Sequence, residues 1–190
     1  MSRRFDVQDT PLEGVKLIHR RPIGDSRGYL ERMFCADELA PLIANRNIVQ
    51  INRTLTVKQG VVRGLHYQLP PYAETKLVCC LRGEVFDVAV DLRRNSATFL
   101  HWHATVLHAE KPVFFLVPEG FAHGFQTLTA GCEMLYFHTA PYQAGSERAL
   151  NVRDPRLGIR WPQEITELSD RDCGHPLLSS DFQGLDLGVV

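Results

Sequence analysis

Short runs of β-branched and aromatic residues recur along most of this chain, separated by turn residues, and they limit the folds that it can form. The clearest run is EVFDVAVDLR, residues 84–93. Between residues 85 and 92, one set of alternating positions is apolar throughout and the other contains Asp87 and Asp91. Such alternation is typical of a β-strand with two different faces. Helical patterns do not alternate with these runs, which disfavours a parallel sheet of βαβ units. The spacing therefore predicts an all-β chain folded as an antiparallel sandwich or barrel.

The other predicted elements follow from similar patterns. A short helix is predicted in DELAPLIANR, residues 37–46, with Asp37 as N-cap and with Leu39, Leu42 and Ile43 on one face. The tail after DPRLGIRWP is expected to be irregular or briefly helical, packed on the outside through Trp161. Further strands are predicted in the runs 14–34 (with a break at residues 24–25), 47–56, 60–68, 75–83, 98–107, 112–120, 122–129 and 132–142.

The overall composition is that of an ordinary globular protein. A net charge of −1 over 190 residues gives no indication of binding to nucleic acid or to a membrane surface. The chain starts without the apolar segment of a signal peptide, and no apolar run approaches the length of a membrane span. Five cysteines, an odd number with no CxxC pair, predict free thiols. We therefore expect one domain in the cytoplasm.

Eight histidines make a metal site the first chemistry to test. The tripeptide HWH places His101 and His103 on the same side of a strand, which is a spacing that can hold a metal ion. That stretch offers no acidic third ligand on the same face, and two polar residues on a solvated strand face explain the pattern as well. His66 has no H-x-H partner, because position 68 is glutamine. No metal is therefore predicted.

Several other motifs each admit a structural and a functional interpretation. In VVRGLHYQLPP, His66 is either a hydrogen-bonded core residue or a titrating group in a cavity. GDSRG, residues 24–28, is a turn whose Arg27 is either solvated or able to reach a phosphate. His123 lies in PEGFAHGF, which its proline and glycines predict to be a stiff turn. Tyr136 shares a strand face with His138, and LSDRD, residues 168–172, predicts a capped turn.

Taken in chain order, these runs resemble the dTDP-4-dehydrorhamnose 3,5-epimerase family over residues 10–178. The resemblance implies a cupin-like jelly roll with short peripheral helices, and one domain over residues 1–190 with a peripheral tail from about residue 179. It also implies a homodimer that exchanges N-terminal strands, a dTDP-linked 4-keto-6-deoxysugar as substrate, and no metal or other cofactor. The matching motifs are GDSRG, VVRGLHYQ, KLV, RGEVFDVAVDLR, PEGFAHGFQTL, EMLYFHT, DPRLGIRWP and ELSDRD.

The same resemblance assigns a role to individual residues. His66 matches the general base, Asp172 the carboxylate that orients it, and Tyr136 the acid on the opposite face of the sugar. Lys76 of TKLV resembles the lysine near the sugar ketone. The expected substrate contacts are Arg27, Gln50, Asn52, Arg63, His123, Tyr142, Glu147 and Arg171.

These residue types suit the inversion of a carbon next to a ketone. A positioned base supplies on the order of 10²–10⁴ in rate, and a preorganised donor for the enolate oxygen about 10²–10³. Inversion also needs a second group on the opposite wall, which a barrel cavity can provide. Arg63 and His66 are three residues apart, so a regular strand would point them to opposite faces. Either a bulge at Gly64 re-aims one of them, or Arg63 reaches another site, for example across a dimer interface.

The sequence also departs from the family pattern, at positions that leave the substrate open. Arg32 stands where a glutamate is common, Ile51 and Arg53 where aspartate and histidine are common, Phe137 where lysine is frequent, and Ile23 where an aromatic residue is frequent. The alternatives are a mono-epimerase or ketoisomerase on another nucleotide sugar, a non-catalytic sugar-nucleotide-binding cupin, and a metal-dependent cupin. The nucleotide, the number of inverted carbons and the final deoxysugar are not predicted.

Overall fold

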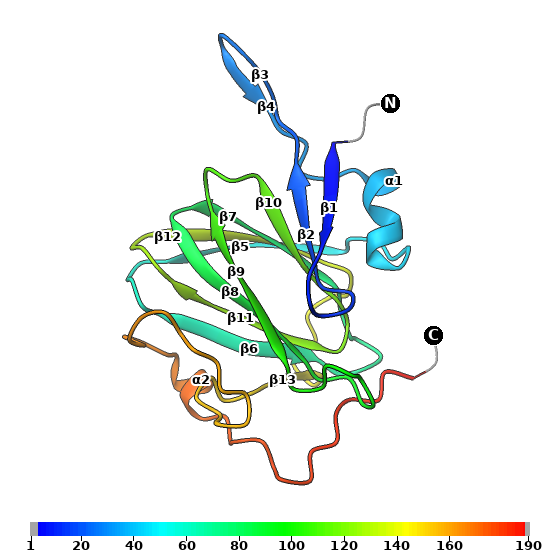
Figure 1. The fold of residues 1–190 in the computed structure, drawn as a ribbon, viewed down its shortest axis with the longest axis vertical. Coiled ribbons are helices and arrows are strands. Elements are labelled where there is room, and N and C mark those ends of the chain that lie inside the picture. The colour runs from blue at the N-terminus through cyan, green and yellow to red at the C-terminus, as the bar shows by residue number, and fades with distance from the viewer. Residues whose placement is uncertain (1–3, 189–190) are drawn as a thin grey trace.

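The computed structural model of the chain describes residues 4–188, whose strands form two antiparallel sheets and a separate hairpin (Figure 1). The prediction of an all-β antiparallel fold is thus confirmed. In spatial order, the six-stranded sheet contains β1 (Phe5–Asp9), β2 (Lys16–Arg20), β10 (Val113–Val117), β7 (Lys76–Arg82), β12 (Cys132–His138) and β5 (Gln50–Thr56). The five-stranded sheet contains β13 (Glu147–Ala149), β6 (Val62–Gln68), β11 (Phe121–Thr127), β8 (Glu84–Asp91) and β9 (Trp102–His108).

The main core lies between the two sheets, where alternating side chains of both meet. On β8, Val85 and Ala89 belong to this core, whereas Val88 packs into a second cluster on the outer face of its sheet. On β12, Tyr136 faces inward and Phe137 faces outward into a third cluster. Two antiparallel sheets with alternating inner residues form a jelly roll of the cupin type, as predicted.

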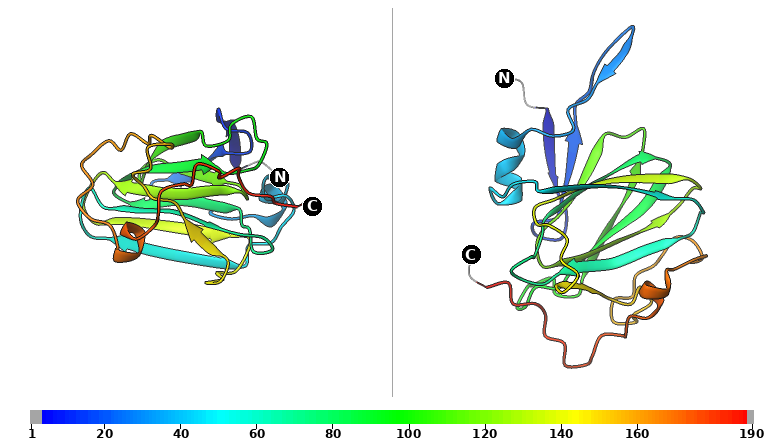
Figure 2. Two further views of the ribbon diagram at one scale, coloured as in Figure 1. Left: turned by 90° about the horizontal axis from the view of Figure 1, so that it is seen from below. Right: turned by 180° about the vertical axis from the view of Figure 1, so that it is seen from behind.

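The C-terminal segment covers the outer face of the five-stranded sheet (Figures 1 and 2). Trp161 meets the ring of Phe86 edge-on at 6.1 Å between centroids, and its Nε1 donates to the carbonyl oxygen of Val152. This packing was predicted for Trp161. The tail after residue 179 also contacts the sheet, because Leu185 is buried and its backbone pairs with that of Leu92. Residues 189–190 of the predicted peripheral tail lie outside the described residues.

The predicted helix of residues 37–46 is shorter and starts earlier than expected. It consists of α1 (Ala36–Leu39) and the 3₁₀ turn η1 (Ala40–Ile43), and its N-cap is Cys35 rather than Asp37. Pro41 has no N–H to continue the α-helical ladder, which explains the change to a tighter turn. The shared apolar face is confirmed by the burial of Leu39 and Ile43. No helix in the described part of the chain is long and apolar enough to span a membrane.

GDSRG forms the turn of a hairpin that extends away from the two sheets (Figure 1). Its strands are β3 (Ile23–Asp25) and β4 (Gly28–Leu30), so the predicted turn is confirmed and the chain reverses one residue after the expected break. Strand β1 was not predicted, although Phe5 and Val7 alternate with polar residues in it. It pairs with β2 at the edge of the six-stranded sheet.

The predicted stiff turn around His123 is wrong, whereas the strand predicted over residues 122–129 is confirmed by β11 (Phe121–Thr127). His123 lies within β11, which is buried along its whole length and pairs with β6 and β8 on either side. Gly120 does belong to a turn and has φ +81°, but Gly124 lies inside the strand.

Candidate active site

A cavity of about 430 Å³ opens between the two sheets and is lined by side chains from both. Strands β5, β7 and β12 contribute from one sheet, and β6, β11 and β13 from the other, with the short helix α2 (Asp170–Cys173) at its margin. The structure brings together all predicted site residues except Arg27: His66, Lys76, Tyr136 and Asp172, together with Gln50, Asn52, Arg63, His123, Tyr142, Glu147 and Arg171.

A β-bulge allows Arg63 and His66 to line the same cavity. His66 lies opposite His123 and Arg63 opposite Phe125, so three steps on β6 match two steps on β11. The extra residue on β6 turns the side chains of Arg63 and His66 to the same face of the sheet, which is the effect of a bulge at Gly64. At this point β6 and β11 approach so closely that a Cβ built on Gly64 would lie 2.6 Å from the Cα of Gly124. Only glycine fits on both strands here.

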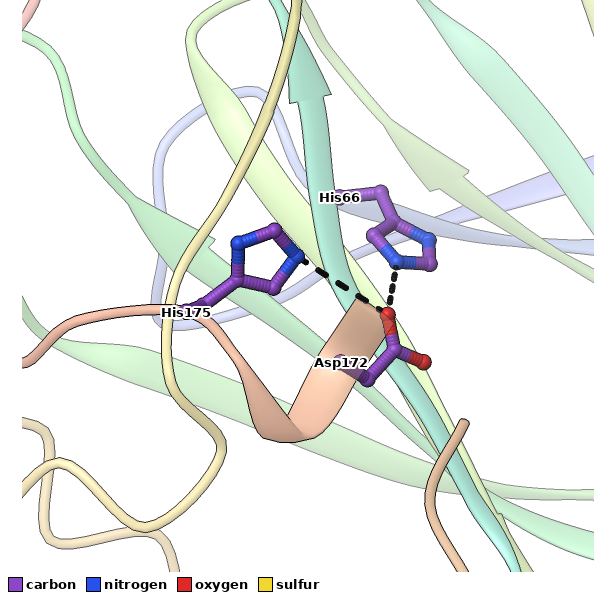
Figure 3. Close-up of side chains that lie close together, drawn as sticks. All are labelled: His66, Asp172 and His175. Atoms are coloured by element: carbon purple, nitrogen blue, oxygen red, sulfur yellow. Dashed lines mark hydrogen bonds and ion pairs between the residues drawn. The ribbon is translucent and has the colours of Figure 1, made fainter. Parts of the chain in front are cut away.

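His66 and Asp172 form a hydrogen-bonded pair at the wall of the cavity. The Nε2 atom of His66 lies 2.7 Å from Oδ1 of Asp172 (Figure 3). Asp172 is held by α2, whose N-cap Ser169 accepts a bond from the backbone N–H of Asp172 at 3.1 Å, which confirms the predicted capped turn. Burial acts to raise the pKa of Asp172, but the hydrogen bond and charge of His66 outweigh it and hold the pKa below its usual value.

Tyr136 enters the cavity from the sheet opposite His66. Its ring stacks on His138 at 6.1 Å between centroids and meets His123 edge-on at the same distance. Tyr136 is 9% exposed. Burial, assisted by the nearby Asp87 carboxylate, raises the pKa of the Tyr136 phenol well above its usual value. The phenol therefore stays protonated at neutral and mildly alkaline pH, so that a proton is present for donation.

Lys76 is a buried cation with a buried partner that the sequence did not reveal. Its Nζ lies 3.3 Å from Oε1 of Glu74, and the other carboxylate oxygen of Glu74 lies 2.7 Å from Nδ1 of His138. The His138 Nε2 atom faces the amide of Asn52 at 3.4 Å. Burial tends to raise the pKa of Glu74, but Lys76 and His138 together bring it below the usual value. Glu74 thus links the Lys76 ammonium group to His138, which in turn contacts Asn52.

A second imidazole–carboxylate pair lies deeper between the sheets. Nε2 of His123 is 2.6 Å from Oδ1 of Asp87, which is completely buried, and the other Asp87 oxygen has no hydrogen-bond partner among residues 4–188. Asp87 was predicted on a strand face but not as a site residue. A carboxylate within the apolar alternation of EVFDVAVDLR was the available signal, because such a group needs a buried partner.

The predicted substrate-binding residues lie at the cavity, with one exception. Arg63 donates to the hydroxyl of Thr56 at 2.9 Å, Gln50 accepts from the backbone of Tyr142 at 2.9 Å, and Arg171 pairs with Glu147. Arg27, in contrast, sits at the tip of the β3–β4 hairpin. It is outside the cavity of its own chain, and its side chain is 88% exposed beside Asp25.

None of the residues that depart from the family pattern lines this cavity. Ile51 and Arg53 are on the outer face of β5, where Arg53 pairs with Glu133. Phe137 packs at right angles against Phe114 on the outside of the six-stranded sheet. Arg32 pairs with Glu38 near α1, and Ile23 belongs to the projecting hairpin. The departures therefore leave the cavity of a single chain unchanged.

His101 and His103 of HWH belong to no group of three metal-ligating side chains in the described part of the chain. His101 is exposed and precedes β9, while His103 is half-buried against the ring of Phe115, and burial lowers the pKa of His103. The solvated-face interpretation is thus right for His101 and wrong for His103. Among residues 4–188, a group of three metal-ligating side chains occurs instead at His66, Asp172 and His175.

A jelly roll whose two sheets line one cavity with an imidazole, a phenol and an ammonium group has the features of a cupin-type enzyme that moves protons on a small polar substrate. Comparison with known proteins gives the family. The chain belongs to the dTDP-4-dehydrorhamnose 3,5-epimerase family, whose sequence model matches residues 9–180. By this membership it is an isomerase of the carbohydrate epimerase type.

Individual relatives cover almost the whole chain. The dTDP-4-dehydrorhamnose 3,5-epimerase of Sinorhizobium fredii is 44% identical over 172 residues, which are 90% of this chain and 88% of the relative. A solved dTDP-6-deoxy-D-glucose-3,5-epimerase from Legionella pneumophila, in complex with dTDP-4-keto-L-rhamnose, is 35% identical with a TM-score of 0.88, covering 97% of this chain and 100% of that chain. A 3'-monoepimerase from Streptomyces bikiniensis, in complex with dTDP-quinovose, is 30% identical with a TM-score of 0.81, covering 88% and 85%.

Proposed function

We propose that this chain inverts C3 and C5 of a dTDP-linked 4-keto-6-deoxyhexose by removing each α-proton and replacing it on the opposite face. The observation that carries the proposal is the placement of His66 and Tyr136 in one cavity, on strands of opposite sheets. Family membership supports the substrate class, because all three relatives named above are epimerases and two of them, from Sinorhizobium fredii and Legionella pneumophila, are 3,5-epimerases.

His66 is the base in this mechanism. Its Nε2 faces the Asp172 carboxylate, so Nε2 carries the proton and Nδ1 keeps the lone pair that accepts the α-proton. Asp172 holds this tautomer and stabilises the imidazolium that forms. Removal of the proton places negative charge on the ketone oxygen. The Lys76 ammonium, buried and held by Glu74, is the preorganised partner for that charge.

Tyr136 supplies the proton that completes the inversion. Its hydroxyl donates to the carbanion from the wall opposite His66, and solvent later restores the proton to the phenol and removes one from His66. The raised pKa of Tyr136 keeps the donor protonated before each turnover. Each inversion is therefore balanced, with one proton taken by an imidazole and one delivered by a phenol.

The substrate's diphosphate needs cations, and this need connects the cavity to the dimer that we also propose. Arg63 and Arg171 are at the cavity, whereas Arg27 lies outside it, at the tip of an exposed hairpin. The hairpin carries exposed apolar side chains, with Tyr29 75% and Leu30 68% exposed. Apolar surface of this kind on a projecting hairpin suits contact with a second copy of the chain. In the proposed homodimer, N-terminal strands are exchanged and Arg27 serves the partner's cavity.

Two further predictions from the sequence remain proposals. We infer a single catalytic domain over residues 1–190, because the family model extends across both sheets and the C-terminal segment. We also infer a cytoplasmic location, which the five free cysteines support.

The reaction is tested by incubating the protein in D₂O with dTDP-4-keto-6-deoxyglucose and following the sugar by NMR. We expect deuterium at both C3 and C5, and a product with both centres inverted. Deuterium at only one carbon would identify a mono-epimerase, and migration of the ketone would identify a ketoisomerase. Absence of exchange with every keto-sugar nucleotide offered would refute the proposed function.

The dimer is tested by mixing two inactive variants, Arg27→Ala and His66→Ala, under conditions that exchange subunits. If Arg27 acts in the partner's cavity, half of the sites in each mixed dimer contain both wild-type residues, and activity returns. If Arg27 acts in the cavity of its own chain, no mixed site regains activity, and if Arg27→Ala is active by itself, Arg27 has no role in the reaction. Light scattering on the parent protein measures the oligomeric state independently.

A further inference from the structure

Three metal-ligating side chains meet where β6 and α2 come together, at the margin of the cavity (Figure 3). His66 Nε2 lies 2.7 Å from Asp172 Oδ1, and His175 Nε2 lies 4.0 Å from the same oxygen. All three ligand atoms lie within 4.8 Å of one another. Within residues 4–188, the buried Nε2 of His175 has no hydrogen-bond partner. A buried ring nitrogen without a partner, aimed at a carboxylate, is the unexplained feature of this cluster.

We propose that His66, Asp172 and His175 form an inhibitory site for Zn²⁺. Two imidazole nitrogens and one carboxylate oxygen make a donor set that zinc commonly accepts, with a fourth position left for water. Ligands about 2.0–2.2 Å from a tetrahedral zinc ion lie roughly 3.3 Å from one another. The separations of 2.7 Å and 4.0 Å from Asp172 Oδ1 bracket that value. The three ligand atoms, all within 4.8 Å of one another, are thus near the separations that a tetrahedral zinc site requires.

The inhibition rests on the proposed function of His66 as the base. A zinc ion bound at Nε2 takes the position of the Nε2 proton, and that proton moves to Nδ1. Nδ1 is the atom that must accept the α-proton, so the metal-bound imidazole is no longer a base. The ion also neutralises the Asp172 carboxylate that stabilises the imidazolium. Zinc and catalysis thus compete for the same imidazole.

His175 separates the two properties, because it binds the metal without lining the cavity. Substitution of His175 removes one of three protein ligands and leaves the His66–Asp172 pair in place. We expect His175→Ala to weaken zinc binding at least 10-fold while the epimerisation rate without metal stays close to that of the parent. His101→Ala, which removes an exposed histidine outside the proposed zinc site, is the matched control and should change neither zinc binding nor the epimerisation rate.

The experiment titrates the full-length parent and both variants with CoCl₂, followed by absorption spectroscopy, and with ZnCl₂, followed by calorimetry. The parent should bind one ion per chain, and its Co²⁺ form should show the absorption spectrum of a tetrahedral site. Zn²⁺ should inhibit deuterium exchange into the sugar, and EDTA should reverse this inhibition. No stoichiometric binding, or equal affinity in His175→Ala, would overturn the proposal. Thermal unfolding without metal verifies that His175→Ala is folded, and His175→Gln replaces it if it is not. Metal binding is read without substrate, so failure of the epimerase assay leaves this result unaffected.

Discussion

The His66 imidazole and the Asp172 carboxylate lie 2.7 Å apart although 106 positions separate them in the chain. Strand β6 provides one and the Ser169-capped helix α2 provides the other. The C-terminal segment crosses the outer face of a sheet, and α2 then reaches the margin of the cavity. The fold of that segment is therefore part of the catalytic apparatus that we propose.

The first prediction concerns the tautomer of His66. Asp172→Asn replaces an acceptor by an amide that can donate to Nε2, which moves the imidazole proton to Nδ1 and blocks the base. We expect deuterium exchange to slow by about 10²–10⁴ while affinity for dTDP is unchanged. NMR exchange rates and calorimetry with dTDP measure the two quantities. Asp170→Asn, an exposed neighbour in the same helix, is the control. A normal exchange rate in Asp172→Asn would contradict the assigned role.

The second prediction separates proton removal from inversion. Tyr136→Phe keeps the ring packed and deletes the acid, so His66 still abstracts the α-proton. We expect deuterium in recovered substrate, with formation of inverted product reduced by about 10²–10⁴. Tyr72→Phe, at a half-buried tyrosine outside the cavity, should behave like the parent. Because burial raises the pKa of Tyr136, loss of its proton should not limit the rate at mildly alkaline pH. Equal loss of exchange and inversion would assign Tyr136 another role.

The sequence predicted those parts of the fold that depend on local alternation. Strand β8 shows this best, because its apolar and mixed faces could be read directly from EVFDVAVDLR. The motif resemblance then identified His66, Lys76, Tyr136 and Asp172, which all line one cavity. Gly64 was expected to host a bulge because Arg63 and His66 have the wrong parity for a regular strand, and the bulge is present.

The contacts between distant segments could not be predicted in this way. Asp87 and His123 pair across neighbouring strands, and Glu74 and His138 pair across 64 positions, which local periodicity does not encode. The glycine of AHGF was read as a turn residue because composition does not distinguish a turn from a close strand crossing. In the homodimer that we propose, Arg27 acts in the cavity of a second copy of the chain, and such a contact cannot be derived from the sequence or from a single chain.

The third prediction concerns the buried pair of Glu74 and Lys76, whose side chains are 8% and 10% exposed. Glu74→Gln leaves Lys76 as a buried cation without its carboxylate, and we expect the free energy of unfolding to fall by about 3–5 kcal/mol. Adding Lys76→Met to Glu74→Gln should recover most of this loss without restoring epimerisation. Urea unfolding of the parent, the two single variants and the double variant gives the coupling energy between the two side chains. Additive effects of the two substitutions would mean that the pair contributes no net interaction.

The fourth prediction concerns Asp91, a fully buried carboxylate that accepts hydrogen bonds from Arg93, Ser96 and Thr98. Burial acts to raise the pKa of Asp91, but these bonds outweigh it and the pKa lies below the usual value. The resulting stability is present above the unfolded-state pKa of about 3.9 and is lost as the pH falls towards the folded-state pKa.

The free energy of unfolding of Asp91→Asn should therefore be about 2–3 kcal/mol lower than that of the parent at pH 7. This difference should narrow below pH ~4. Urea unfolding at neutral and acidic pH measures both values. Asp186→Asn changes an exposed carboxylate and serves as the control. A difference that stayed constant or widened as the pH fell would show that the ionised form of Asp91 is not the stabilising one.

The fifth prediction tests whether the close approach of β6 and β11 positions the base. A Cβ on Gly124 would lie 2.6 Å from the carbonyl oxygen of Arg63 and 3.0 Å from the Cα of Gly64, so Gly124→Ala must push β6 away. We expect a loss of about 1–3 kcal/mol in unfolding free energy, together with a larger proportional loss of deuterium exchange, because His66 follows the bulge on the same strand. Gly145→Ala adds the same methyl group where nothing lies within 4 Å, and it should change neither quantity. Exchange at the parental rate in a folded Gly124→Ala protein would mean that His66 keeps its position without the close crossing, and that the bulge only corrects the direction of Arg63.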